Sequence, residues 1–106
     1  MKYTNYTNLD SRFARPYEPG DRLVKGWEGD IAVHGNIRGT LEAIFTCHNR
    51  DNRPDGQLCP SMSVGDVVVL DIGRGASYSV KDVGFVGVQL DPADLITDRT
   101  WREVDY

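Results

Sequence analysis

Three residues in the middle of the chain, Cys47, His48 and Cys59, have side chains that bind metals or act in catalysis. Together with His34 they supply the residue types of a structural zinc site. Zinc sites usually take their ligands in pairs separated by a few residues, whereas Cys47 and His48 are adjacent and Cys59 stands alone beside Pro60. Adjacent side chains on a helix also point about 100° apart. We therefore expect no metal site and no cofactor.

The same region offers a nucleophile, a base and an orienting acid in Cys47, His48 and Asp51. Nucleophilic catalysis requires the base to bond the nucleophile directly, which adjacent helical residues do not readily do. The simpler interpretation is that Cys47 fills the core and that His48 lies at the end of a helix, where positive charge favours the helix dipole. We therefore expect no enzymatic activity. A small-ligand or hydrolytic enzyme using Cys47 or His48 is kept as an alternative.

The densest polar cluster in the sequence is Arg-Asp-Asn-Arg at residues 50–53, and a Pro-Asp-Gly turn at residues 54–56 follows it directly. In the structural interpretation, its Asp and Asn side chains cap turns and its arginines pair with nearby acids. In the functional interpretation, two guanidinium groups on a rigid turn bind carboxylates or phosphates. Trp101 is a further candidate, because Trp and Arg predominate among interface hot spots, although it would equally suit covering a sheet edge. The predicted partner-binding residues are Arg50, Asp51, Asn52, Arg53 and Trp101.

The overall charge disfavours a general nucleic-acid binder. Twelve basic and sixteen acidic residues give a net charge of −4, whereas affinity for phosphate comes from clustered Lys and Arg. A local patch of Arg38, His48, Arg50 and Arg53 would still allow a nucleic-acid-binding module, which is the second hypothesis.

The length of 106 residues corresponds to one domain. Residues 1–20 are polar, aromatic and rich in turn formers, and we predict a loosely held N-terminal arm followed by a single domain over residues 21–106. The sequence has no apolar run approaching the length of about 18 residues that a membrane span needs. The N-terminus also lacks the apolar region of a signal peptide, so we expect a cytoplasmic protein.

The apolar pattern predicts which elements position these residues. A strand is expected over residues 22–27, and a helix from Thr40 as N-cap to Asn49, with its apolar face at residues 41, 44, 45 and 48. Three antiparallel strands are expected within residues 67–72, 78–81 and 86–90, and a second helix from Asp91. The predicted fold is α+β: a small antiparallel sheet of three to five strands, one main helix packed on a face, and a short C-terminal helix. A partly open small barrel is the alternative.

Several short motifs occur in a characteristic order: LEAIF at 41–45, NR at 49–50, RP at 53–54, SMSVGDVV at 61–68, YSV at 78–80 and GF at 84–85. On these motifs the stretch from about Leu41 to Val88 resembles the YodL-like domains of phages and conjugative elements. Within larger proteins such domains look like accessory modules, so the resemblance implies a mobile-element origin and transfers no catalytic residue.

These observations lead to one functional expectation. The chain is predicted to be a small non-enzymatic accessory protein, encoded by a phage, that binds a host or phage protein in the bacterial cytoplasm. A homodimer is also conceivable at this stage, because a small sheet leaves unpaired edges that proteins often cover.

Overall fold

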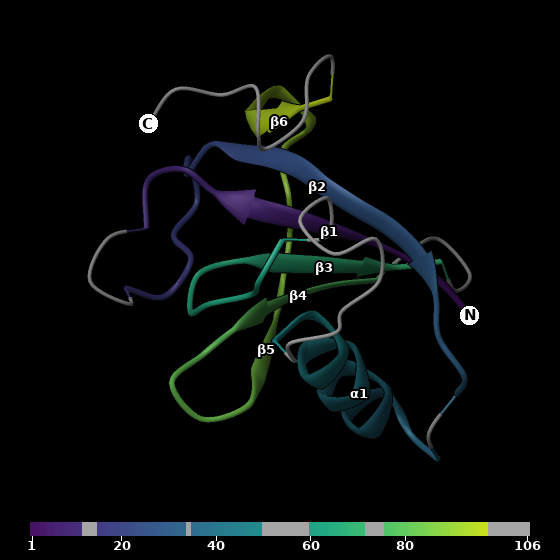
Figure 1. The fold of residues 1–106 in the computed structure, drawn as a ribbon. Coiled ribbons are helices and arrows are strands. Elements are labelled where there is room, and N and C mark those ends of the chain that lie inside the picture. The colour runs from purple at the N-terminus through teal and green to yellow at the C-terminus, as the bar shows by residue number, and fades with distance from the viewer. Residues whose placement is uncertain (12–14, 34, 50–59, 72–75, 98–106) are drawn as a thin grey trace.

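The fold is a single curled sheet with one α-helix against it (Figure 1). The structure is a computed structural model that describes residues 1–11, 15–33, 35–49, 60–71 and 76–97. The six strands form an open half-barrel in the order β5-β4-β3-β1-β2-β6. The elements are β1 (Lys2–Asn8), β2 (Leu23–Asp30), α1 (Ile37–Asn49), β3 (Val67–Leu70), β4 (Ala76–Val80), β5 (Phe85–Val88), η2 (Pro92–Asp94) and β6 (Leu95–Ile96).

The predicted fold class is wrong, because the described residues are mostly sheet, with six strands and a single α-helix. The architecture is nearer to the alternative, a partly open barrel. The expected C-terminal helix is only a short 3-10 turn, η2. Its start was predicted correctly, since the side chain of Asp91 accepts a hydrogen bond from the backbone of Ala93 and proline follows it. The turn ends at once because Leu95 and Ile96 pair in parallel with β2.

The N-terminal segment is a central strand, so the expectation of a loosely held arm is wrong for residues 2–8. Strand β1 pairs antiparallel with both β2 and β3. Tyr3 packs with the core on the helix side of the sheet, and Tyr6 packs with the core on the other side. The Thr and Asn residues between the two tyrosines give the segment the composition of a loop, but both aromatic rings are buried.

The three-stranded meander was predicted correctly. Strands β3, β4 and β5 are consecutive antiparallel neighbours, and β3 lies between β4 and β1. Val67, Val68 and Leu70 are completely buried. The continuous apolar run of this strand is thus explained by cover on both faces.

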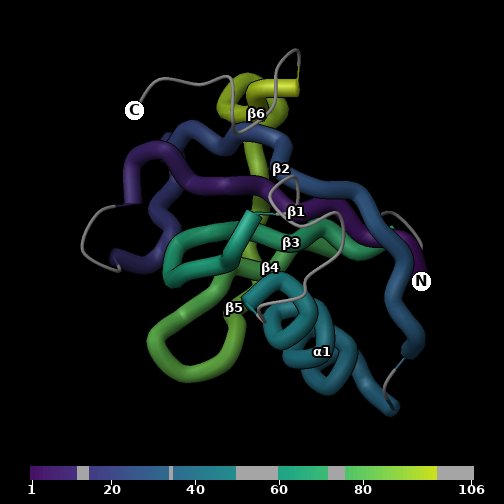
Figure 2. Tube along the Cα trace, in the orientation of Figure 1, coloured from purple at the N-terminus to yellow at the C-terminus, as the bar shows by residue number. Residues whose placement is uncertain are grey.

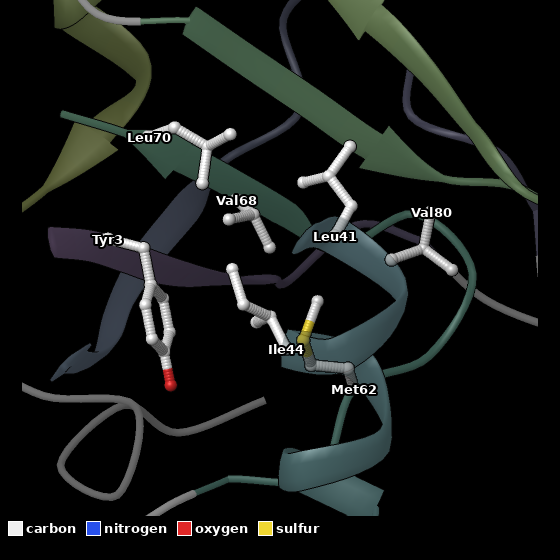
Figure 3. Packing of buried hydrophobic residues seen from close by; sticks show 7 residues of the cluster. All are labelled: Tyr3, Leu41, Ile44, Met62, Val68, Leu70 and Val80. Carbon is white, nitrogen blue, oxygen red and sulfur yellow. The ribbon is translucent and has the colours of Figure 1, made fainter. Parts of the chain in front are cut away.

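The main core lies between α1 and the sheet (Figure 3). Leu41 and Ile44 of α1 are completely buried, as the one-faced pattern of the helix predicted. They pack against side chains from four segments of the chain: Tyr3, Met62, Val68, Leu70 and Val80. No helix in the described ranges is long and apolar enough to span a membrane.

The opposite face of the sheet carries a second, smaller core around Tyr6, Leu23 and Val67. After β5 the chain passes behind the sheet to reach β6 at the other edge (Figure 2). Leu90 of this crossing segment and Leu95 of β6 pack against the second core, so the sheet is covered on both faces.

A buried polar cluster at the end of β1 holds the β1–β2 connection in place. The backbone N–H of Asn8 donates to Asp66 at 2.9 Å, and its side-chain amide donates to Asp21 and to the Gly65 carbonyl, both at 3.0 Å. Burial by itself would raise the pKa of Asp21, but hydrogen bonds from Arg15, Asn8 and the Glu18 backbone outweigh it and lower that pKa. These groups bond to one another, which indicates a structural role.

Candidate functional site

The five partner-binding residues predicted from sequence cannot be placed in this fold. Arg50, Asp51, Asn52, Arg53 and Trp101 all lie outside the described residues. Their role in recognition stays a prediction.

His48 is a buried structural residue. Its ring is completely buried, with Nε2 at 2.9 Å from the Tyr3 hydroxyl and Nδ1 at 2.8 Å from the carbonyl oxygen of Pro60. A carbonyl only accepts, so Nδ1 carries a proton, and in the neutral ring Nε2 then accepts from Tyr3. The ring therefore ties the end of α1 to β1 and to the segment before β3. Its burial removes it from the nucleic-acid patch and from any surface catalytic role.

No metal site is present in the part of the chain that the structure describes. There, no three His, Cys, Asp or Glu residues lie close enough together to hold an ion. Cys47 is half-buried on α1, while His34 and Cys59 lie outside the described residues.

Replacing Tyr3 with phenylalanine should lower the free energy of unfolding by about 1–3 kcal/mol, because it removes a hydrogen bond to a buried ring nitrogen. Tyr17→Phe is the matched control, since the buried Tyr17 hydroxyl has no hydrogen-bond partner among the residues that the structure describes. In urea unfolding, the free energy of unfolding should fall for Tyr3→Phe and should stay nearly the same or rise for Tyr17→Phe. Equal losses in the two variants would contradict the role assigned to the His48 contact.

A groove lies between the start of α1 and the β4–β5 hairpin. It encloses about 380 Å³. We call it the β5 groove, and its lining residues are Ile37, Arg38, Leu41, Tyr78, Val83, Gly84, Phe85 and Gly87. Two of its apolar side chains face solvent: Val83 is 78% exposed and Ile37 is 41% exposed.

The first turn of α1 forms one wall of the groove, and this turn begins at Ile37, one turn earlier than predicted. Asn36, and not Thr40, caps the helix: its side-chain oxygen accepts from the Gly39 backbone at 2.8 Å. Ile37 and Arg38 therefore form the first turn of α1 and line the groove. The Gly35-Asn36 pair before the helix was the sequence signal for this start, because Asn ranks above Thr as an N-cap.

The β4–β5 hairpin provides the other wall. The backbone N–H of Lys81 donates to the Gly84 carbonyl at 2.9 Å, which closes the turn, and Gly84 has a positive φ of 80° that favours glycine. Val83 therefore stands at the tip of a tight turn, where an apolar side chain has no core to enter. An isolated valine between Asp82 and Gly84 was the available sequence signal.

Arg38 is the one charged residue among the described residues that line the groove. Its Nε lies 3.2 Å from Glu42, an exposed pair one helical turn apart that contributes little to stability. One terminal nitrogen of the same guanidinium lies 3.6 Å from the position that a Cβ on Gly84 would occupy. The positive charge of Arg38 thus reaches from α1 to the β4–β5 hairpin on the other side of the groove.

Comparison with known proteins gives one match. A family model described as YodL-like domain matches residues 1–90, which confirms the resemblance and extends it to the first 40 residues. Searches of the curated proteins and of the solved structures found no match. Since the matched residues make up most of the chain, this protein belongs to the YodL-like domain family.

Proposed function

We propose that this chain is a small non-enzymatic accessory protein that acts by binding another protein through the β5 groove. The observation that carries the proposal is the pair of solvent-facing apolar side chains, Ile37 and Val83, on opposite walls of one groove. Apolar side chains that gather around a surface depression are typical of interaction sites.

The chemistry of the lining supports binding over catalysis. Its residue types are apolar, aromatic, glycine and one arginine. An acid–base or nucleophilic mechanism needs a proton acceptor such as His, Asp or Glu near the reacting group, and none is found among the described residues that line this groove. The groove offers apolar contact area and one fixed positive charge, which suits recognition of a polypeptide.

The resemblance to modules of phages and conjugative elements suggests where the partner originates. We propose that it is a protein of the bacterial host or of the mobile element itself, met in the cytoplasm. A nucleic-acid partner has less support, because Arg38 is the one cation that the described residues contribute to the groove and because His48 is buried. Phosphate affinity requires several clustered cations.

The test is capture of proteins from bacterial lysate by the wild-type chain and by the double variant Ile37→Ser, Val83→Ser. Capture of the partner is expected to fall by at least about tenfold, since two exposed apolar anchors are lost from one site. The thermal midpoint should change little, because exposed substitutions usually shift stability by less than about 0.5 kcal/mol.

Val33→Ser is the matched control, because Val33 is also apolar and 60% exposed but does not line the groove. Its capture should equal that of the wild type. Capture that survives the groove variant, or that Val33→Ser abolishes equally, would contradict the proposal. Arg50→Ala with Arg53→Ala tests the charged loop predicted from sequence in the same assay.

A further inference from the structure

The backbone of β5 has hydrogen-bonding groups directed away from the sheet. In an antiparallel pair, residues that exchange hydrogen bonds alternate with residues that exchange none. Lys81 and Gly84 are a hydrogen-bonded pair across the hairpin. Counting every second pair from there, Ser79–Val86 and Ser77–Val88 are hydrogen-bonded, and the pairs of Phe85 and Gly87 with β4 are not. The N–H and C=O groups of Phe85 and Gly87 therefore point outward.

The β3–β4 pairing confirms this alternation. Val80 donates to the carbonyl of Asp66, the residue just before β3, so Val80, Tyr78 and Ala76 bond toward β3. The serines between them, Ser77 and Ser79, are left to bond toward β5. The two ladders agree, and the outward direction at Phe85 and Gly87 follows from both.

Within the described residues, this edge lacks the usual protection against pairing. Proteins commonly blunt an exposed edge with lysine, proline or a bulge. The β5 sequence is Phe-Val-Gly-Val, and its pairing with β4 keeps one register throughout. β5 is the last strand of the sheet on this side, and its outward-bonding residues, Phe85 and Gly87, also line the β5 groove.

We propose that the partner binds by adding an extended segment to β5 as a further strand, with an apolar side chain in the β5 groove and a carboxylate on Arg38. This deepens the proposed function and rests on it. Directly opposed residues share a face of the sheet, so the partner residue opposite Gly87 faces the groove. Gly87 leaves space there, since a Cβ built on it meets nothing within 4 Å.

The occupant is a segment of another protein and not a second copy of β5. The hydrogen bond from Arg38 to Glu42 uses Nε, and a terminal nitrogen of the guanidinium lies beside Gly84 at the groove, where it can bind a partner carboxylate. The Phe-Val-Gly-Val strand carries no carboxylate. Strand addition with a side chain in a pocket is an established mode of recognising short extended peptides.

The decisive variant is Gly87→Pro, with Gly87→Ala as its control. Proline removes the outward N–H of residue 87, while the ladder to β4 does not use that group. Alanine keeps the N–H and its Cβ meets no neighbour. The two variants therefore differ in the one group that an added strand would bond.

The probes are peptides selected from a random linear library on the full wild-type chain. Selection should enrich peptides that combine an apolar residue with Asp or Glu. Fluorescence anisotropy should give similar affinity for wild type and Gly87→Ala, and at least about tenfold weaker affinity for Gly87→Pro. Equal affinity for the two Gly87 variants would overturn strand addition. The proposed function would stand if Ile37→Ser with Val83→Ser still abolished binding, and would fail if that variant bound normally.

Amide hydrogen exchange provides a measurement that needs no variant. The N–H groups of Phe85 and Gly87 should exchange quickly in the free protein and at least about tenfold more slowly with a selected peptide bound. Unchanged exchange at both positions in the complex would overturn the proposal. Sedimentation that showed a wild-type dimer lost in Gly87→Pro would assign the edge to a second copy and would also overturn it.

Discussion

Replacing Gly65 with alanine is expected to lower the free energy of unfolding by about 3–4 kcal/mol, the sum of backbone strain and overpacking. Gly65 has φ of +96°, a left-handed conformation that costs a side chain about 1–2 kcal/mol. A Cβ at this position would also lie 2.6 Å from Cβ of Ser11 and 2.8 Å from the carbonyl oxygen of Arg15. Both neighbours belong to the segment that the buried polar cluster fixes, so neither can move aside cheaply.

Gly20→Ala is a closely matched control for this prediction. Gly20 has the same φ of +96°, but a Cβ built there meets nothing within 4 Å. Gly20→Ala should therefore lower the free energy of unfolding by the backbone strain alone. The net loss should be about 1 kcal/mol, because alanine also reduces the entropy of the unfolded chain and so offsets part of the strain. Urea unfolding of both variants separates the two contributions. Equal losses would mean that the segment at Ser11 and Arg15 yields to the added methyl group.

The elements that sequence reasoning found correctly are those whose pattern is local. The face of α1 repeats at helical spacing, with Leu41, Ile44 and His48 all buried. The valine run of β3 is apolar enough to identify a covered strand without knowledge of its neighbours. Residues close in sequence determine both patterns, so a single sequence is sufficient to read them.

The elements that were missed depend on distant partners. Strand β1 is polar at Thr4, Asn5 and Thr7, and it is a strand because β2 and β3 pair with it on both sides. β6 has two residues and exists because Leu95 and Ile96 meet the start of β2. With these two strands the sheet extends beyond the predicted three to five and curls into a half-barrel. Pairing over such separations leaves little trace in local composition.

The β5 groove was missed for a related reason. Its walls come from the first turn of α1 and from the β4–β5 hairpin, which only the folded chain brings together. Sequence reasoning instead favoured the polar cluster at residues 50–53, because charged residues on a predicted turn are visible in a sequence. An apolar residue such as Val83 becomes informative only when its exposure is known.

Asp66 is expected to make the protein more stable at mildly acidic pH than at neutral pH. Burial raises the pKa of its carboxyl from 3.8 to about 6, although backbone N–H groups of Asn8 and Ser63 donate to it at 2.9 and 3.0 Å. The native state then holds a proton that the unfolded chain has released between these two values. The resulting stability is fully present below pH 3.8 and is lost as pH rises through about 6.

The size of this effect follows from the same values, since a pKa raised from 3.8 to about 6 corresponds to about 3 kcal/mol over the whole range. Urea unfolding of wild type and Asp66→Asn at pH 4.5 and 7.5 isolates it. On acidification from pH 7.5 to 4.5, the free energy of unfolding should rise by about 2 kcal/mol more in wild type than in Asp66→Asn, because asparagine does not titrate. The absolute stability of Asp66→Asn matters less, since its amide must face one of the two N–H donors.

Asp21→Asn is the control for the pH experiment, because it removes a carboxyl from the same polar cluster with the opposite shift. The pKa of Asp21 is lowered in the fold, so its contribution to stability is present above about pH 4 and is lost on further acidification. In Asp21→Asn, the difference in the free energy of unfolding between pH 4.5 and pH 7.5 should equal that of the wild type, even if the variant is less stable at both pH values. If Asp66→Asn also keeps that difference, Asp66 does not titrate in this window. The hydrogen bonds from Asn8 and Ser63 would then hold its charge against the effect of burial.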